Sequence, residues 1–181
     1  MHTLASGGYT VSHRMSPSSA FIRPATPADF EAILRLNQEW EHFTSPLDRA
    51  RLARLHAQAV YHRVHECDGQ VVAFLLAFGP GADYDSPNYR YFEDVGDDFI
   101  YIDRIVVGHA QQRSGLGEAL YDDVLGFARD HGAVRLTCEV DLEPLNVGSD
   151  RFHARRGFVE VATQRVADGR KRVSLRECDV N

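Results

Sequence analysis

The chain has 181 residues, 44% of them hydrophobic and 25% charged, a composition typical of a soluble globular protein that can bury one sheet-and-helix core. A formal net charge of −6, without any Lys/Arg cluster, argues against a nucleic-acid partner, and no apolar run reaches the roughly 18 residues that a membrane span needs. The three cysteines lack C-x-x-C spacing, which favours reduced thiols in the cytoplasm, and no histidine or cysteine spacing predicts a metal site.

The N-terminal residues do not show the pattern of a folded element. Residues 1–20 are rich in Ser and Gly with scattered His, and no apolar core flanked by basic residues marks a secretory signal. We therefore expect a disordered leader over residues 1–20 and a single domain over residues 21–181. The domain begins with a short strand at residues 21–23, and Thr26 followed by Pro27 predicts the start of the first helix.

Helical and extended patterns alternate over the next part of the chain. Apolar residues at helical spacing predict a second short helix around residues 52–59. Two strand-like stretches, residues 60–66 and 71–78, meet at an Asp-Gly turn and predict a hairpin. Residues 79–98 contain many Gly, Pro, Asp and Tyr, and we interpret them as a long functional loop, because disordered segments are poor in aromatics.

The centre of the chain combines a strand, a glycine-containing turn and a helix. Residues 100–107 form an apolar run rich in β-branched residues, which is typical of a strand. From Leu116 onward, apolar residues recur at helical spacing. The turn between them carries Gly115 and Gly117, whose missing Cβ atoms allow an anion to approach the backbone. Free N–H groups at the positive end of the helix then predict a site for a phosphate-bearing ligand.

The remaining elements complete a mixed sheet. Residues 133–140 are predicted to form a strand, and residues 146–156 a short helix that ends at Gly157. A closing hairpin follows, with strands at residues 158–166 and 170–178. The predicted order is β-α-α-β-β-β-α-β-α-β-β. Hairpins flank one strand–helix–strand unit in this order, so the sheet should contain both parallel and antiparallel pairs.

The glycine turn has two further interpretations. A strand, glycines, a helix and then Glu139, 22 residues after Gly117, also match the spacing of a dinucleotide-binding fold. Against this, the third small residue of G-x-G-x-x-G would be Leu120, and the turn is longer than the tight dinucleotide turn. A turn that binds no ligand is the other alternative, because a lone Gly-x-Gly is a weak signal.

Two motifs together resemble a known family. The first is Val107 followed by Gln112-x-x-Gly115-x-Gly117, and the second runs from Asn146 through Ser149 and Phe152-His153 to Gly157-Phe158. This pattern resembles the GNAT N-acyltransferase superfamily over about residues 21–178, and its Phe-His variant resembles a group of bacterial predicted acetyltransferases. The resemblance implies an α/β fold whose mixed sheet of about seven strands has a splayed central pair and is flanked by about four helices.

The resemblance also implies acetyl-CoA as the donor. In the family the pantetheine arm pairs with the exposed backbone of the central strand, and the pyrophosphate sits on the N–H groups of the glycine turn. For Asn146 and Ser149, helix capping is an equal alternative to a place beside the thioester. The residues expected to bind acetyl-CoA are Ile105, Val106, Val107, Gln112, Arg113, Ser114, Gly115, Leu116, Gly117, Asn146, Ser149 and Phe152.

The implied chemistry is attack of a neutral amine on a thioester, which needs a base for the amine proton. Asp103 is the first candidate, because it lies in the middle of an apolar strand and, by alternation, on the same face as Val107. An ion pair with a nearby Arg is the alternative role for Asp103. Glu139, at the end of the neighbouring strand, is the second candidate. His153 stands where many family members carry Tyr, so it is a candidate acid or base, or else a packing histidine.

Two segments are predicted to form the acceptor pocket: the connection between the first two helices, and the loop that enters the central strand. Both mix aromatic and acidic residues, a composition suited to a cationic amine. The alternative is that these aromatics only fill the core. The residues expected to bind the acceptor are Asn37, Trp40, Phe43, Tyr84, Asp85, Asn88 and Tyr89.

Together these observations predict a cytoplasmic enzyme that uses acetyl-CoA to acetylate a primary amine of a small molecule or peptide. The alternatives are a CoA-binding regulatory module without catalysis and, third, a dinucleotide-binding oxidoreductase. The expected partners are the amine substrate and, as in many such folds, a second copy of the chain in a homodimer. Nucleic acid, membrane and metal are not expected.

Overall fold

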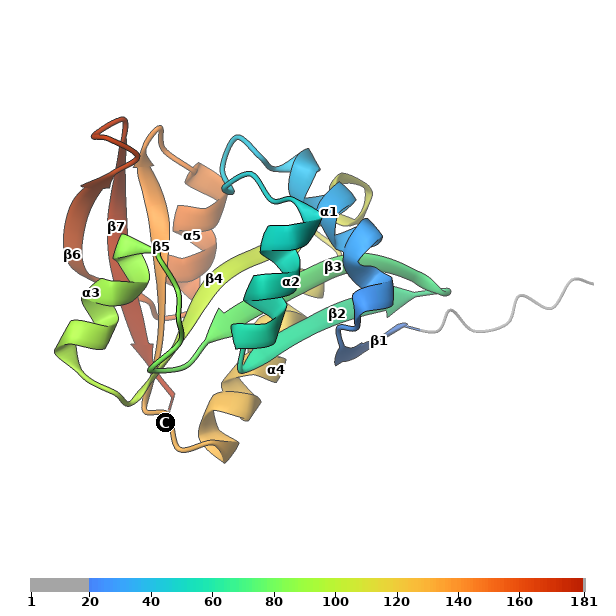
Figure 1. The fold of residues 1–181 in the computed structure, drawn as a ribbon, viewed down its shortest axis with the longest axis horizontal. Coiled ribbons are helices and arrows are strands. Elements are labelled where there is room, and N and C mark those ends of the chain that lie inside the picture. Colours follow the sequence, from blue (N-terminus) through green and yellow to red (C-terminus); the bar gives the residue numbers. More distant parts are fainter. Residues whose placement is uncertain (1–19, 181) are drawn as a thin grey trace, which may run out of the picture.

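The computed structural model describes residues 20–180, which form a seven-stranded mixed sheet covered by helices (Figure 1). The predicted leader lies outside the described residues except for Ala20, which already belongs to the first strand. The strands are β1 (Ala20–Pro24), β2 (Tyr61–Cys67), β3 (Gln70–Phe78), β4 (Phe99–Val107), β5 (Arg135–Glu143), β6 (Val159–Val166) and β7 (Lys171–Asp179). The α-helices are α1 (Phe30–Glu39), α2 (Arg49–Gln58), α3 (Pro87–Val95), α4 (Leu116–Asp130) and α5 (Val147–Arg155), and two 3₁₀ turns occupy Pro27–Asp29 and His109–Gln111.

The strand order is β1-β2-β3-β4-β5-β7-β6, and β4–β5 is the one parallel pair within residues 20–180. Tight turns join β2 to β3 and β6 to β7, and in both the Asp-Gly pair takes positive φ angles, as the hairpin prediction requires. The parallel pair is connected through α4, which lies against the sheet. The predicted mixed α/β sheet with hairpins around one strand–helix–strand unit is therefore confirmed.

Alternating side chains divide the core between the two faces of the sheet. On β3, Phe74 and Leu76 pack with α1, α2 and α3, whereas Ala73 and Leu75 pack with α4 and α5. These central strands are buried on both faces, which explains why their sequences are almost continuously apolar. Among the described residues, no helix combines the length and the apolar character needed to cross a membrane.

One predicted loop is wrong in part. Residues 79–98 contain α3, which begins after Ser86, whose side chain accepts a hydrogen bond from the Tyr89 N–H, with Pro87 in the first turn. The described chain therefore has five α-helices rather than about four. The sequence signal was the Ser86-Pro87 pair, and the aromatic residues after it form the buried face of the helix, with Tyr89 and Phe92 fully inaccessible to solvent.

The central strands separate part of the way along their length. The β4–β5 pairing runs from Phe99↔Arg135 only to Ile102↔Cys138, and in Figure 1 the two ribbons diverge beyond this point. Beyond Cys138, β5 continues along β7 instead, as far as Glu143↔Arg172. The edge of β4 that follows Ile102 is therefore left without a neighbouring strand, which is the splayed central pair that the resemblance implied.

A β-bulge lies where the two strands separate. Leu76 of β3 pairs with Arg104 and Ala77 pairs with Ile102, so Asp103 is the extra residue of β4. After the bulge the side-chain alternation is reversed, and Val107 packs on the α4 side while Asp103 points to the other face, where it contacts Tyr84. The expectation that Asp103 and Val107 share a face is wrong, because a bulge shifts the alternation by one residue.

We expect the contact between α4 and the sheet to carry a large part of the stability. Leu120 is completely buried in the core cluster of this face, so Leu120→Ala should lower the free energy of unfolding by about 2–5 kcal/mol through the cavity it leaves. Urea unfolding followed by circular dichroism measures this. Val159→Thr, at a side chain that is 59% exposed on β6, is the control and should change it by less than about 0.5 kcal/mol. Equal losses would contradict the assignment of the core.

Candidate active site

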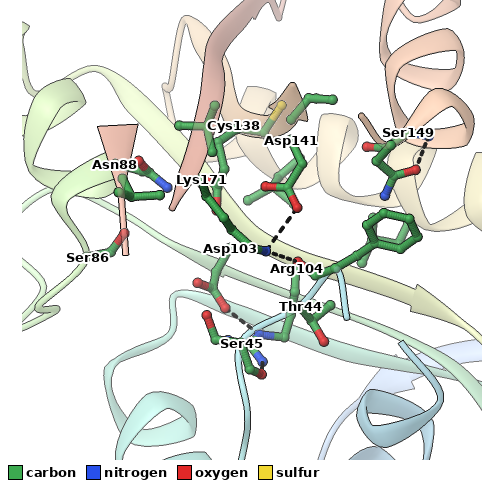
Figure 2. Close-up of a pocket in the computed structure, with 18 of the residues that line it drawn as sticks. Thr44, Ser45, Ser86, Asn88, Asp103, Arg104, Cys138, Asp141, Ser149 and Lys171 are labelled. Atoms are coloured by element: carbon green, nitrogen blue, oxygen red, sulfur yellow. Dashed lines mark hydrogen bonds and ion pairs between the residues drawn. The ribbon is translucent and has the colours of Figure 1, made fainter. Parts of the chain in front are cut away.

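A cavity of about 500 Å³ lies where β4 and β5 separate. Its wall is formed by the connection between α1 and α2, the segment that leads into α3, the two separating strands, the start of α5 and the turn between β6 and β7 (Figure 2). The predicted site residues that the structure brings together in this wall are Phe43, Tyr84, Asp85, Asn88, Asp103, Ile105, Glu139, Asn146, Ser149 and His153.

The cationic side chains of the wall are all held by carboxylates. The ion pairs are Arg51–Asp85 at 3.1 Å, Arg104–Asp103 at 2.6 Å and Lys171–Asp141 at 3.0 Å. Lys171 is the only lysine of the chain, and its Nζ also donates to the Phe43 carbonyl across the cavity at 3.3 Å. Within residues 20–180, Glu139 has no lysine or arginine partner, which separates it from the other carboxylates that line the buried part of the cavity.

Asp103 is held by groups on both sides. The Arg104 Nε donates to one carboxylate oxygen, the Tyr84 hydroxyl donates to the other, and both members of the ion pair are only 4% exposed. Arg104 also donates to the Asn37 side-chain oxygen at 2.8 Å and to the Ser45 carbonyl at 3.3 Å. Asp103 therefore forms the ion pair that the sequence left as its alternative role, and through Arg104 this pair orders the connection between α1 and α2.

Glu139 is a half-buried carboxylate that opens into the cavity. Burial, and after it the negative charge of Asp103, raise the pKa of Glu139 from its ordinary value of 4.5, and hydrogen bonds from Tyr101 and Asn88 lower it, so that the resulting pKa is about 7. The Tyr101 hydroxyl lies 2.5 Å from the Glu139 Oε2 and donates to it. A carboxylate with this pKa can both take up and release a proton at neutral pH.

His153 lies on the inner side of α5 with only 5% of its surface exposed. Its Nδ1 is 2.8 Å from the Ser149 carbonyl, which can only accept, so Nδ1 carries the proton and Nε2 accepts from the Tyr121 hydroxyl at 2.5 Å. Burial lowers the pKa of His153 to about 4. The imidazole is therefore neutral near pH 7, and both of its nitrogens are engaged within the protein.

The start of α5 uses the predicted capping residue. The Asn146 side chain accepts a hydrogen bond from the Ser149 N–H at 3.0 Å, so Asn146 is the N-cap of the helix. Asn146 and Ser149 also line the cavity, as Figure 2 shows for Ser149. The capping role and the position in the cavity wall, which the sequence left as alternatives, thus occur together.

The unpaired edge of β4 exposes two backbone positions. The Gly108 N–H donates to the carbonyl of Val72 on β3 at 2.9 Å. Because backbone N–H and C=O groups alternate in direction along an antiparallel strand, those of Val106 also face β3, whereas those of Ile105 and Val107 face the gap between β4 and β5. Val106 was predicted to present its backbone to a ligand, and this is corrected by the alternation. At the outer end, the Trp40 Nε1 donates to the Val107 carbonyl at 3.0 Å.

The glycine turn curls onto the first turn of α4. Arg113 and Gly115 have φ angles of +61° and +83°, and Gly115 is the N-cap. The first hydrogen bond of the helix joins the Ala119 N–H to the Gly115 carbonyl at 3.0 Å. The N–H groups of the helical residues before Ala119 therefore have no carbonyl partner within the helix. A Cβ at Gly117 would lie 3.7 Å from the Phe152 ring and 3.9 Å from Val107, which brings the helix start next to the open edge of β4.

The rest of the turn is held by its own hydrogen bonds. The Ser114 hydroxyl donates to the Gln111 carbonyl, and the Gln112 N–H donates to the His109 carbonyl at 3.4 Å. These bonds hold the turn at the N-terminus of a 15-residue helix, the kind of place that accepts an anion. The residues of the turn and helix start that the sequence assigned to the donor, Gln112, Arg113, Ser114, Gly115, Leu116 and Gly117, therefore lie outside the cavity wall but follow the open edge of β4 directly.

Three residues predicted to bind the acceptor lie outside the cavity wall. Asn37 is 2% exposed and holds Arg104 and Ser45, while Trp40 contacts the far end of β4. Tyr89 is fully buried, and its hydroxyl donates to the Gly79 carbonyl and accepts from the Ala82 N–H. The expectation that these three side chains line the pocket is therefore corrected: Asn37 and Tyr89 hold neighbouring segments, and Trp40 lies at the outer end of β4.

The sequence interpretation missed several residues of the site. Tyr101 and Asp141 could have been found by alternation, since each lies two residues from a predicted carboxylate on its strand, Asp103 and Glu139. Lys171 carried a weaker signal as the only lysine of the chain. Tyr121, by contrast, reads as one more core position of α4, and nothing in its local sequence points to His153.

The part of the chain that the structure describes has no group of three or more His, Cys, Asp or Glu side chains arranged to hold a metal ion.

A model of the acetyltransferase (GNAT) family matches residues 28–158, which is most of the chain. This range includes both motifs through Gly157-Phe158, as well as β4, the glycine turn, α4 and β5. No curated protein matched the chain.

Solved structures with the same fold cover nearly all of this chain. Ard1 from Thermoplasma volcanium is 22% identical, with a TM-score of 0.74, and the match covers 90% of this chain and 98% of Ard1. The ribosomal-protein-S18-alanine N-acetyltransferase from Escherichia coli is 19% identical, with a TM-score of 0.69 and coverage of 90% and 95%. YncA, a putative acetyltransferase from Salmonella typhimurium solved with acetyl-CoA, is 24% identical, with a TM-score of 0.66 and coverage of 90% and 94%.

We expect His153 to remain a neutral imidazole protonated on Nδ1 throughout pH 5–8, because its pKa is about 4 and Tyr121 occupies Nε2. Nitrogen-15 NMR of the histidine rings measures this, with His153→Gln to assign the signal. A His153 ring that becomes cationic between pH 6 and 7 would contradict the arrangement.

Arg104→Met should be strongly destabilising, because it leaves the Asp103 carboxylate buried without its cation. We expect a loss of about 3–5 kcal/mol in the free energy of unfolding. Arg172→Met removes an exposed ion pair with Glu143 and should cost at most about 1 kcal/mol. Chemical unfolding of both variants at pH 7 compares them, and similar losses would disprove the organising role of Arg104.

Proposed function

The chain belongs to the acetyltransferase (GNAT) family, and we propose that it transfers an acetyl group from acetyl-CoA to a primary amine of a small molecule or of a peptide N-terminus. The observation that carries this proposal is Glu139, a carboxylate with a pKa of about 7 in a cavity that opens between two separating strands. A group of this kind suits removal of a proton from an attacking amine at neutral pH.

The donor would lie along the open edge of β4. Its diphosphate would be held by backbone N–H groups at the start of α4, and its amide-containing arm by the backbone of Ile105 and Val107. The left-handed Gly115 supports this, since a Cβ is absent at the turn and nothing else lies within 4 Å of where it would be. The structure of YncA, which has the same fold, contains acetyl-CoA as its cofactor, which agrees with this donor.

Glu139 is the better candidate for the base than Asp103. Asp103 is committed to Arg104 and Tyr84, so a proton on it would cost the ion pair. His153 is a weak base, because its pKa is about 4 and Tyr121 occupies its free lone pair. We therefore assign Glu139 as the base and Asp103 to ordering the wall. His153 holds the phenol of Tyr121 beside the cavity.

In the proposed reaction the amine nitrogen forms a bond to the acetyl carbonyl carbon, and the carbon–sulfur bond of the thioester breaks. Glu139 accepts the proton that the nitrogen loses, directly or through one water. The sulfur keeps the electron pair of the broken bond, so CoA leaves as a thiolate that then takes up a proton from water. Outward-facing N–H groups on β4, at Ile105 or Val107, are the candidates to stabilise the carbonyl oxygen as negative charge develops.

The charges of the cavity favour a cationic acceptor. Each lysine or arginine of the wall is already bound to a carboxylate, so no free cation repels an incoming ammonium group. Glu139 and the rim residue Glu41 add negative charge. A relative with the same fold acts as a ribosomal-protein-S18-alanine N-acetyltransferase, which makes a peptide N-terminus a reasonable first acceptor to test.

Two alternative functions, a dinucleotide-binding oxidoreductase and a CoA-binding module without catalysis, are less well supported. A dinucleotide-binding oxidoreductase is ruled out by the family assignment and by the antiparallel strands on both sides of the β4–α4–β5 unit. A CoA-binding module without catalysis predicts donor binding without turnover. The raised pKa of Glu139 favours the enzyme, because a module that only binds CoA has no use for such a base.

We expect acetyl-CoA and a panel of amines and peptide N-termini to release CoA thiol at a measurable rate, detected with a thiol reagent. Glu139→Gln should lower kcat/KM about 10²–10⁴-fold for the best amine, since it removes the base. Asp123→Asn is the matched control, because its carboxylate also accepts from a buried tyrosine, Tyr61, but lies outside the cavity. Binding of CoA with no thiol release from any amine would favour the non-catalytic module.

Trp40 offers a test of the donor site that needs no acceptor. It is the only tryptophan of the chain, and its indole occupies the Val107 carbonyl at the open edge of β4. A donor that pairs with Val107 should displace the indole, so CoA should change the tryptophan emission in a saturable way. Gly115→Ala should weaken this response, because the left-handed conformation is unfavourable for alanine. If millimolar CoA changes neither the tryptophan emission nor the melting temperature, the proposed donor site is refuted.

A further inference from the structure

Two buried phenols meet two carboxylates in the cavity. The Tyr84 hydroxyl donates to Asp103, and the Tyr101 hydroxyl donates to Glu139 at 2.5 Å. The two pairs differ in what else holds the carboxylate. Arg104 neutralises Asp103, whereas Glu139 has no cationic partner in the described chain. The phenol of Tyr101 is thus the strongest donor that Glu139 has.

Packing around Tyr101 fixes the direction of its hydroxyl group. The residue is fully buried, and its ring lies 5.6 Å from Tyr89 and 6.0 Å from Phe92 between ring centroids. A side chain packed on all sides keeps one rotamer, so the direction of its O–H bond is set by the core around α3. Burial and the nearby carboxylates raise the pKa of Tyr101 well above its ordinary value, so the phenol keeps its proton.

We propose that Tyr101 is a positioning residue that fixes the orientation of the Glu139 carboxylate and keeps it ionised at neutral pH. The inference rests on the proposed role of Glu139 as the base. A phenol donates a stronger hydrogen bond to a carboxylate than to a neutral carboxylic acid, so it favours the ionised form. Its hydroxyl donates to Oε2, which fixes the direction in which the carboxylate faces the cavity.

The other groups around Glu139 act in both directions. Asp103 from β4 disfavours the ionised form of Glu139, and the adjacent Arg104 offsets that charge. The Asn88 side chain of α3 donates to Glu139 and favours its ionised form. The remaining titratable groups that face it are Tyr84, which keeps its proton, and Tyr121, Cys138 and the Asp141–Lys171 pair, which adds no net charge.

Tyr101→Phe removes only the hydroxyl and tests the inference. We expect the acidic limb of the pH profile of kcat/KM to move upward by about one pH unit, because one hydrogen bond to a charged group is lost. Above that limb the variant should approach the wild-type rate, which a merely structural role would not produce. Tyr61→Phe is the matched control: it removes an equally buried phenol that donates to Asp123 at 2.6 Å outside the cavity, and should leave the profile in place.

Carbon-13 NMR of glutamate carboxyl groups gives a readout that does not depend on activity, with Glu139→Gln to assign the signal. In the wild type the Glu139 signal should titrate near pH 7, and in Tyr101→Phe about one unit higher. An unchanged titration in Tyr101→Phe overturns the inference, whatever the activity. If the titration shifts but Glu139→Gln keeps the wild-type kcat, Glu139 is not the base. Tyr101 then has no positioning role in the reaction, although its hydrogen bond to Glu139 is supported.

Discussion

The structure depends on the point at which β4 stops pairing with β5. Four residues of parallel ladder, ending at Ile102↔Cys138, hold the two halves of the sheet together, and the bulge at Asp103 follows immediately. A bulge bends its strand and increases its twist, so it gives a physical reason for the two strands to part here. The separation creates an unpaired backbone edge on one strand and a cavity beside the other. Every group assigned to the proposed reaction lies along one of these two features.

The charged groups of the cavity follow from the same geometry. The bulge sends Asp103 and Arg104 to the same face, where they form a buried ion pair next to the connection between α1 and α2. Buried pairs add little net stability compared with apolar residues, yet losing one partner is costly, so this pair mainly orders its surroundings. With Arg51, Arg104 and Lys171 all neutralised, Glu139 is left as the carboxylate whose proton is exchangeable at neutral pH.

The neighbourhood of α5 combines packing and polarity in a small space. His153, Tyr121 and the Ser149 carbonyl form a chain of hydrogen bonds between α4 and α5, with Phe152 and Phe158 packed around it. A buried neutral histidine between a phenol and a carbonyl satisfies all of its polar atoms, which is the condition for a polar group to be tolerated in a core. The same chain brings the phenol of Tyr121 to the cavity wall, beside the position at which the resemblance implies an acid.

The sequence by itself determined the periodicities, the hairpin turns, the glycine turn before a helix and the two motifs, and from these the mixed sheet and the family could be inferred. Such features are local, because they depend on residues a few positions apart. Only the tertiary structure decided that Asp103 leaves the face of Val107, that Trp40 reaches β4 and that Tyr89 packs instead of lining the cavity. Above all it decided which carboxylate is free, since Arg104 lies next to Asp103 in the chain while Tyr101 and Glu139 are 38 positions apart. The pKa of a buried group depends on every charge and donor around it, and folding brings those together from distant parts of the chain.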